Sequence, residues 1–145
     1  MINMNKEYVS FAVAKLLKKK GFPQTKDIAL AMYNEYKYFC SLCPKDEEYY
    51  LFEDFDEKDY VAATYEQVLS WLRTKGFHLY CYIGSDDSRD VDGKIVDEWH
   101  FWSYDITDMC GDTIYDIQSV IDTTEYETYE KACEAGIKYC LKNLI

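Results

Sequence analysis

The sequence lacks the marks of several protein classes. No apolar run approaches the roughly 20 residues that a membrane-spanning helix needs. The stretch Met1–Lys20 contains neither a continuous apolar core nor a small-residue cleavage site, so we expect no signal peptide. No glycine-rich phosphate loop is present either. We therefore expect a cytoplasmic protein with no membrane span and no bound cofactor.

Basic residues are scarce over most of the chain. The last hundred residues carry 24 Asp and Glu against 8 Lys and Arg, and neither Lys nor Arg occurs from Ile95 to Glu130. The first 45 residues have the opposite balance, with 3 acidic against 8 basic residues. A surface this acidic repels phosphate groups, so we expect neither nucleic-acid nor anionic-membrane binding.

The chain is long enough to bury a core of its own. Its 145 residues fit one domain, and a hydrophobic content of 48% with 17% aromatic residues argues against disorder. We predict a single domain over residues 1–145, within which residues 25–60 form an acidic, aromatic-rich region of undefined structure. Six cysteines without a secretion signal indicate reduced thiols.

The first half of the sequence predicts a helix and a hairpin. An apolar stripe at helical spacing predicts a helix over Asn5–Lys20, capped by Asn5 and ended by Gly21. Its stripe consists of Val9, Val13, Leu16 and Leu17. The aromatic residues around Cys40 favour extended structure, so we predict a two-stranded hairpin there.

The second half predicts a helix and three strands. Thr64 and Gln67 have the spacing of a capping box, and Gly76 is placed to end the helix that follows. Period-two alternation predicts strands over Leu79–Ile83 and Trp99–Ile106, and a third strand falls within Ile114–Ile121. The stretch Gly84–Glu98 between the first two strands is interpreted as a polar acidic loop.

The C-terminal segment predicts a last helix, capped by Thr128. Gly136 stands inside its apolar stripe, at a cost of about 1 kcal/mol relative to alanine, so we expect a close approach of this helix to the sheet. Cys133 and Cys140 lie about two turns apart on this helix and are not expected to pair. The fold class is therefore α+β, with an antiparallel three-stranded sheet and helices packed on one face.

Three segments carry a resemblance to a known family. They are Lys6–Leu17 with Lys20–Phe22, Trp71–Arg73, and Tyr126–Leu141. On these segments the chain resembles a family of short proteins of unknown function from gut Bacteroidales and their phages. The segment Pro23–Tyr60 departs from the resemblance. The resemblance implies a cytoplasmic α+β protein associated with mobile elements, and it implies no activity.

Two short motifs suggest metal or redox chemistry. Cys40 and Cys43 form a CxxC pair that suits half a zinc site or a redox dithiol, although neither a second CxxC pair nor a closely spaced histidine pair accompanies it. The stretch Ser88–Gly93 is similar to a calcium loop but lacks the first Asp and the twelfth-position Glu. A polar turn with Asp92 and Gly93 at its tip is the better interpretation.

The remaining candidates lie on the predicted strands. His78 and His100, the only histidines, each begin a predicted strand and could face one another across the sheet, but no nucleophile accompanies them. Aromatic side chains form a candidate partner-binding surface, because tyrosine and tryptophan dominate interface hot spots. This set consists of Tyr80, Tyr82, His100, Trp102 and Tyr104. The alternative is that other parts of the fold cover it.

These observations lead to one functional hypothesis and three alternatives. We expect a small, non-enzymatic, cytoplasmic protein-interaction module. The first alternative is an acidic mimic of DNA that uses Asp46–Asp59 and Asp86–Glu98 against a nucleic-acid-binding protein. The second is a zinc-binding or thiol-redox protein that uses Cys40 and Cys43. The third is a homo-oligomer, in which the basic Lys15–Lys20 end meets the acidic body of another copy.

Overall fold

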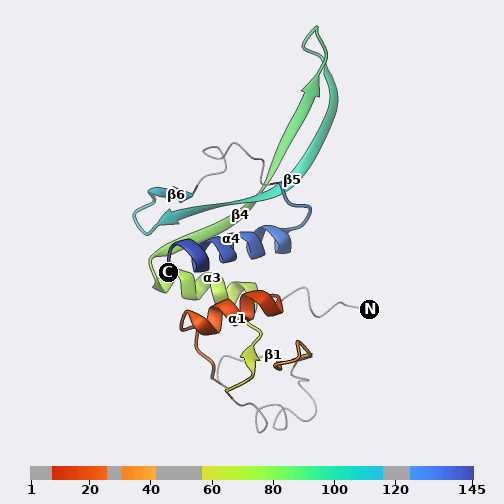
Figure 1. The fold of residues 1–145 in the computed structure, drawn as a ribbon. Helices are drawn as coiled ribbons and strands as arrows, with labels where there is room; N and C mark the ends of the chain where they lie inside the picture. Colours follow the sequence, from red (N-terminus) through yellow and green to blue (C-terminus); the bar gives the residue numbers. More distant parts are fainter. Residues whose placement is uncertain (1–7, 26–30, 42–56, 116–124) are drawn as a thin grey trace. The chain divides into compact units, whose positions relative to one another are not determined.

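The computed structural model describes residues 8–25, 31–41, 57–115 and 125–145 (Figure 1). The chain divides into two compact units. The first consists of Met1–Trp71 with Ile137–Ile145, and the second of Leu72–Gly136. The prediction of a single domain over residues 1–145 stays a prediction. Within the described residues, no helix is long and apolar enough to cross a membrane.

The first helix, α1, spans Phe11–Lys19 and begins later than predicted. Its cap is Ser10, whose Oγ accepts a hydrogen bond from Val13 N at 3.3 Å. The predicted start was wrong because Val9 is held in extended backbone, where its N–H donates to Ala63 O at 2.9 Å. Asn5, the predicted cap, lies outside the described residues. Gly21 follows the helix with φ 93°, as predicted for a residue that ends it.

The predicted hairpin around Cys40 is confirmed and belongs to a small sheet. Strands β1 (Ala31–Tyr33), β2 (Phe39–Ser41) and β3 (Tyr60–Val61) pair antiparallel in the order β2-β1-β3. Asn34 closes the turn between β1 and β2, because its Oδ1 accepts hydrogen bonds from Tyr36 N and Tyr38 N. This sheet belongs to the first unit.

Helix α3 spans Tyr65–Thr74 and has the predicted capping box. Thr64 N donates to Gln67 Oε1 at 3.0 Å, and Gln67 N donates to Thr64 Oγ1 at 3.1 Å. These two reciprocal bonds satisfy two of the backbone donors at this helix end. Gly76, with φ 94°, follows the helix and leads into the next strand.

The second unit contains a three-stranded antiparallel sheet. Strands β4 (Phe77–Arg89), β5 (Ile95–Asp108) and β6 (Thr113–Tyr115) are arranged in the order β4-β5-β6. Helix α4 (Tyr129–Asn143) follows, and Thr128 Oγ1 accepts from Lys131 N at 3.1 Å as its predicted cap. The order of helix, three strands and helix confirms the predicted α+β class. The third strand overlaps its predicted range at Ile114 and Tyr115, and residues 116–124 lie outside the described part.

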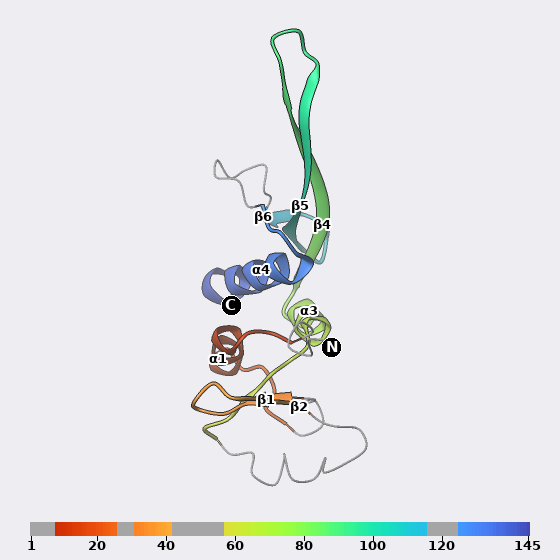
Figure 2. The same cartoon turned by 90° about the vertical axis from the view of Figure 1, so that its right-hand side faces the viewer.

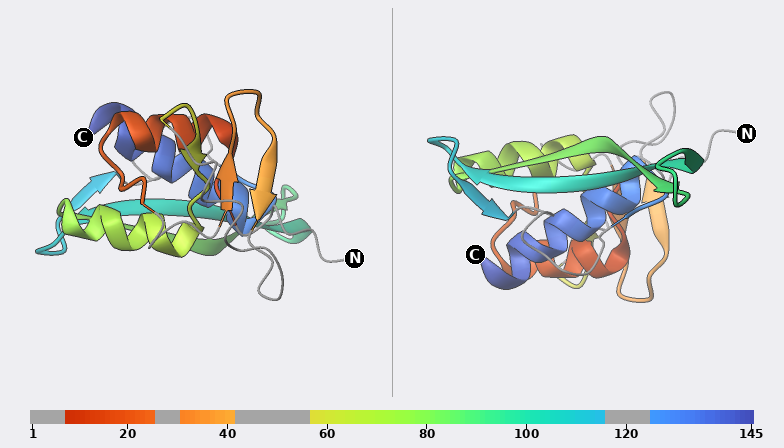
Figure 3. Two further views of the ribbon diagram at one scale, coloured as in Figure 1. Left: turned by 90° about the horizontal axis from the view of Figure 1, so that it is seen from below. Right: turned by 90° about the horizontal axis from the view of Figure 1, so that it is seen from above.

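Helix α4 lies against one side of the β4–β5 ladder (Figure 3). A Cβ built on Gly136 would stand 2.5 Å from Leu79 Cδ1 and 3.1 Å from Tyr104 Cδ2. The predicted close approach of helix and sheet at this glycine is therefore confirmed. Leu79, Tyr104 and Ile106 are buried on this side of the sheet.

The predicted loop over Gly84–Glu98 is wrong, because most of it is strand. The ladder continues without interruption from Phe77 and Asp108 to Ser88 and Asp97, and a register shift follows between Ser88 and Arg89. The turn has the predicted Asp92 and Gly93 at its tip, closed by hydrogen bonds from Asp90 N to Lys94 O and from Gly93 N to Asp90 O. Cross-strand bonds satisfy the backbone here whatever the polarity of the side chains. Figures 1 and 2 show this part of the ribbon extending beyond α4 and β6.

Candidate functional site

The register of the β4–β5 ladder decides which aromatic residues share a face. Tyr80 pairs with Asp105, Tyr82 with Ser103, Gly84 with Phe101, and Asp86 with Trp99. Directly paired residues lie on the same face, and successive residues alternate between faces. The face turned away from Leu79 and α4 therefore carries a line of five rings, which we call the outer aromatic row. It consists of His78, Tyr80, Tyr82, Trp99 and Phe101.

The rings of the outer aromatic row lie close together and are partly open to solvent. The ring centres of His78 and Tyr80 are 5.7 Å apart, and those of Tyr80 and Tyr82 are 6.3 Å apart. Phe101 lies over Gly84, where a Cβ would stand 2.7 Å from the phenylalanine ring. Tyr80 is 40% and Trp99 37% exposed. His78, Tyr80 and Trp99 are thus accessible, whereas Tyr82 and Phe101 are half-buried between them.

Carboxylates line the outer aromatic row. Tyr80 donates its hydroxyl hydrogen to Asp105 Oδ2 at 3.3 Å. Asp86 pairs with Trp99, and Asp97 stands opposite Ser88 on the same face. Aromatic faces attract cations, and adjacent carboxylates strengthen that preference. The chemistry of this face therefore suits lysine and arginine side chains.

The structure divides the predicted aromatic set between the two faces of the sheet. Tyr80 and Tyr82 belong to the outer aromatic row. His100, Trp102 and Tyr104 lie on the opposite face, the one against which α4 packs at Tyr104. Tyr104 is buried, and the Trp102 ring packs edge-on against Tyr129 with centres 5.4 Å apart. His100 stands opposite Ser85 and is exposed. The prediction that these five residues share one face was wrong.

Three members of the row, His78, Trp99 and Phe101, are not in the predicted aromatic set. A signal for them was present. The turn at Asp92 and Gly93 is predicted from the sequence. Counting the same number of residues away from that turn along each strand pairs Tyr80 with Asp105 and Gly84 with Phe101. Turn geometry fixes hairpin register in this way. The interpretation of Gly84–Glu98 as a loop hides this register, because a loop of that length sets no pairing between the strands.

The two histidines do not face one another. His78 pairs with Thr107, whereas His100 pairs with Ser85, seven positions further along β4. An odd number of positions places them on opposite faces, and the separation along the strand is about 23 Å. They cannot act together on one small substrate.

Cys81 on β4 and Cys133 on α4 form a thiol pair that spacing alone did not predict. Their sulfur atoms lie 3.2 Å apart. The hydrogen bond from the Cys81 thiol lowers the pKa of Cys133, and the same contact together with burial raises the pKa of Cys81. The pair therefore holds one proton more firmly than an isolated thiol does.

The zinc interpretation of Cys40 and Cys43 stays a prediction. Cys40 lies in strand β2, and Cys43 lies outside the described residues. In the part of the chain that the structure describes, no three His, Cys, Asp or Glu side chains gather closely enough to hold a metal ion. Elemental analysis of the purified protein tests this interpretation, and the absence of bound zinc would reject a structural zinc site.

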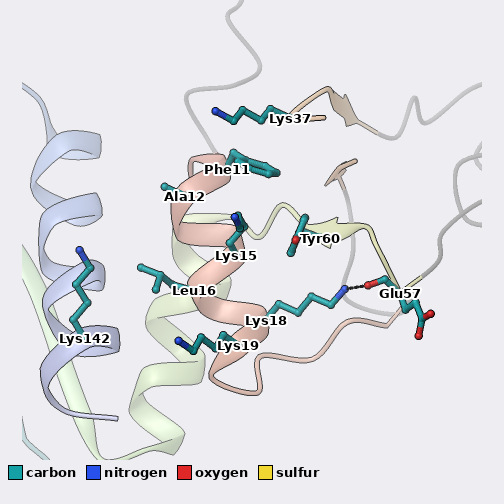
Figure 4. A pocket seen from close by; sticks show the side chains of 10 residues that line it. All are labelled: Phe11, Ala12, Lys15, Leu16, Lys18, Lys19, Lys37, Glu57, Tyr60 and Lys142. Atoms are coloured by element: carbon teal, nitrogen blue, oxygen red, sulfur yellow. Dashed lines mark hydrogen bonds between the residues drawn. The ribbon is translucent and has the colours of Figure 1, made fainter. Parts of the chain in front are cut away.

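A basic groove lies along α1 in the first unit (Figure 4). Its volume is about 740 Å³. We call it the lysine groove; its charged lining consists of Lys15, Lys18, Lys19, Lys37, Lys142 and Glu57, and its apolar lining of Phe11, Ala12, Leu16 and Tyr60. Lysine ammonium groups are set against its aromatic rings, with Lys15 Nζ 5.6 Å and Lys37 Nζ 5.9 Å from the centre of Phe11.

Lys18 is the lysine of the groove whose hydrogen bonds tie the groove to another segment of the first unit. Lys18 donates hydrogen bonds to the backbone oxygens of Glu57 and Asp59 and lies 4.9 Å from the ring centre of Tyr60. Among the described residues the ion pairs are Arg89–Asp87 and Lys131–Glu127, so no groove lysine is paired with a described carboxylate. In a protein of net charge −11, this groove is a local attractor for acidic groups.

The comparisons with known proteins identify no family. No family model, no curated protein and no solved structure matches the chain. The resemblance to proteins of gut Bacteroidales and their phages stays an expectation, and function has to be argued from the geometry of the faces described above.

Proposed function

We propose that this protein is a non-enzymatic interaction module that binds a basic, partly apolar segment of a partner protein on the outer aromatic row. The observation that carries the proposal is the line of five rings, with carboxylates beside it, on the face of the β4–β5 ladder that α4 does not cover. Tyrosine and tryptophan are enriched at interface hot spots, and a group of exposed aromatic residues is uncommon on a surface that binds nothing.

The chemistry of the row defines the kind of partner. Lysine or arginine over an exposed ring contributes about 0.5–1 kcal/mol, and more where the contact is desolvated. Asp86, Asp97 and Asp105 add charge attraction, which speeds association and is weakened by salt. From His78 to Asp86 the row runs about 26 Å along the strand. An extended segment of about eight residues has that length.

The proposal is tested with paired variants in which two exposed residues are replaced. The row variant carries Tyr80→Ser and Trp99→Ser. The control variant carries Val91→Ser and Met109→Ser, because these are also exposed residues of the second unit, at 102% and 61%. Each is used as bait in host lysate at low and moderate salt, and captured proteins are identified by mass spectrometry. Binding of each purified partner is then measured by calorimetry.

The expected result is a partner that binds wild type and the control variant equally and the row variant at least tenfold more weakly. Its binding site should be rich in lysine or arginine, and its affinity should fall as salt rises. A partner that binds the row variant as tightly as wild type would reject the proposal, as would the absence of any partner at either salt concentration.

The DNA-mimic alternative has less support from the described acidic residues. Asp86 and Asp97 lie on the face of the outer aromatic row, whereas Asp87 and Glu98 lie on the opposite face. Mimicry of a phosphate backbone needs carboxylates spread over one surface. The other stretch in that hypothesis, Asp46–Asp59, lies mostly outside the described residues. A captured DNA-binding protein that DNA displaces would favour mimicry over the aromatic-row proposal.

A second candidate function is self-association, and the lysine groove favours it. In this arrangement the tip of the β4–β5 ribbon of one copy, which carries Asp90 and Asp92, lies in the groove of another copy. The groove presents ammonium groups without described carboxylate partners, and the ribbon tip presents exposed acids. Such a contact joins different surfaces of the two copies, so it propagates into rings or open chains.

Self-association is tested by complementation between two charge variants. The groove variant carries Lys15→Gln and Lys19→Gln, which spares the structural Lys18. The ribbon variant carries Asp90→Asn and Asp92→Asn. If wild type self-associates in this way, each variant alone is monomeric in mass photometry and their mixture forms a one-to-one dimer. A monomeric wild type, or a mixture that stays monomeric, would reject this candidate.

A further inference from the structure

Two cysteines far apart in the sequence meet at the contact between α4 and the sheet. Cys81 Sγ and Cys133 Sγ are 3.2 Å apart, and the two residues belong to the same compact unit. We propose that they are an oxidation site at which a hydroperoxide converts the two thiols to a disulfide that fastens α4 to β4. This inference does not depend on the proposed function.

The geometry supports this pairing over the pairing suggested by sequence proximity. A disulfide has a sulfur–sulfur bond of about 2.05 Å, so the two sulfurs need to approach by roughly one further ångström. Rotation of two side chains supplies a movement of that size without a change of backbone. Cys133 and Cys140 lie on one helix about two turns apart and cannot meet in the same way.

A small oxidant can reach the pair from the side of Cys81. Cys133 is fully buried at 0% exposure, whereas Cys81 is half-buried. The two sulfurs are in contact at 3.2 Å, so the first oxidation is assigned to the pair, and the other thiol of the pair resolves it. Cys110 is exposed and Cys140 is buried, and no contact between either of them and another described thiol is seen.

The reaction balances with a hydroperoxide as the oxidant. One sulfur of the pair attacks an oxygen of hydrogen peroxide, the O–O bond breaks, and that cysteine becomes a sulfenic acid while one water is released. The sulfur of the other cysteine then attacks the sulfenic sulfur, the S–O bond breaks, and a second water forms with the remaining thiol proton. The two sulfurs lose two electrons in total, and the peroxide gains them.

The disulfide has a consequence for the surface on the other side of the strand. Cys81 lies between Tyr80 and Tyr82, which point to the opposite face. A covalent link from Cys81 to α4 restricts the movement of the strand segment that carries these two rings. The linkage also closes a loop that contains β5 and β6, which lowers the entropy of the unfolded chain.

The test exposes folded full-length protein to hydrogen peroxide, blocks remaining thiols with N-ethylmaleimide under denaturing conditions, and measures intact mass and tryptic peptides. The expected result is a loss of two hydrogens per chain, a peptide that joins Cys81 to Cys133, and a rise in the thermal midpoint. Dithiothreitol should reverse all three. The same treatment of urea-unfolded protein shows whether the link depends on the fold.

Three variants complete the design. Cys81→Ser and Cys133→Ser should both abolish the cross-linked peptide, whereas Cys110→Ser should leave its yield unchanged. The peptide measurement on wild type decides the matter even if the buried Cys133→Ser variant does not fold. Oxidation that produces only modified Cys110, or disulfides that do not join Cys81 to Cys133, would overturn the proposal. So would a cross-link that forms only in unfolded protein.

Discussion

Leu79 of β4 lies directly over Gly136 of α4, so closely that a Cβ on the glycine would stand 2.5 Å from the leucine Cδ1. The Tyr104 ring approaches the same position from β5, at 3.1 Å. The helix therefore keeps a glycine in its middle although alanine is the better helix former by about 1 kcal/mol. The space left by the absent methyl group is filled by the sheet.

Gly136→Ala should destabilise the protein. The added methyl group forces Leu79 or the helix to move, which costs about 1–3 kcal/mol and outweighs the gain in helix propensity. Urea unfolding followed by circular dichroism measures the change. Leu79→Ala alone leaves a cavity, but the double variant should be more stable than the sum of the two losses predicts. Additive losses would show that a methyl group at position 136 and the Leu79 side chain do not compete for this space.

Thr64→Ala should weaken the start of α3. The variant removes the hydroxyl that accepts from Gln67 N at 3.1 Å and leaves that donor unsatisfied. The expected loss is about 0.5–2 kcal/mol of unfolding free energy. Ser70→Ala is the control, because Ser70 is exposed within the same helix and should change stability little. Equal effects of the two substitutions would contradict a role for the capping box.

Ser103→Ala should stabilise the protein. Ser103 is fully buried, and its hydroxyl oxygen has no hydrogen-bond partner among the described residues. Removal of a buried, unsatisfied hydroxyl is worth about 1 kcal/mol. Ser85→Ala, at an exposed position of the paired strand, serves as the control. A loss of stability in Ser103→Ala would indicate a partner for this hydroxyl outside the described residues.

Cys140 should make stability fall at alkaline pH. Burial raises the pKa of this thiol from 9.0 to about 12 in the folded protein. The folded state keeps a proton that the unfolded chain releases, so the contribution is complete below pH 9 and declines as pH rises from 9 to 12. At pH 10 the decline is about 1.4 kcal/mol.

Comparison with Cys140→Ala isolates this effect from other groups that titrate at high pH. Unfolding free energies are measured under reducing conditions at pH 8 and pH 10 for both proteins. Wild type should lose about 1.4 kcal/mol more than the variant between these two pH values. Parallel behaviour of the two proteins would show that Cys140 does not hold its proton in this way.

Local chemistry made several elements predictable from the sequence. The capping box at Thr64 and Gln67, the cap at Thr128, and the glycines that end α1 and α3 act within a few residues along the chain. Their effects do not depend on distant parts of the fold. Gly136 was predictable for a related reason, because a glycine within an otherwise apolar helical stripe implies a neighbour that comes close.

The two segments whose secondary structure was predicted wrongly, Gly84–Glu98 and the start of α1, have one feature in common. Each forms backbone hydrogen bonds with another segment of the chain, which composition and periodicity do not reveal. The acidic Gly84–Glu98 stretch forms strands because β4 and β5 satisfy each other's backbone groups. Val9 is extended because it bonds to Ala63, which is distant in the sequence. In both places a partner from elsewhere in the chain overrides the local preference.

The sequence by itself determined the charge distribution, the α+β class, the starts of α3 and α4 and the glycines that end α1 and α3, because these follow from composition, periodicity and local hydrogen bonding. Only the tertiary structure decided which aromatic side chains share a face, since a shift of one residue in register exchanges the two faces of a strand. It also decided that Cys81 meets Cys133 and that five lysines share a groove with Phe11. Contacts between distant segments depend on how helices and strands pack, and spacing along the chain does not encode them.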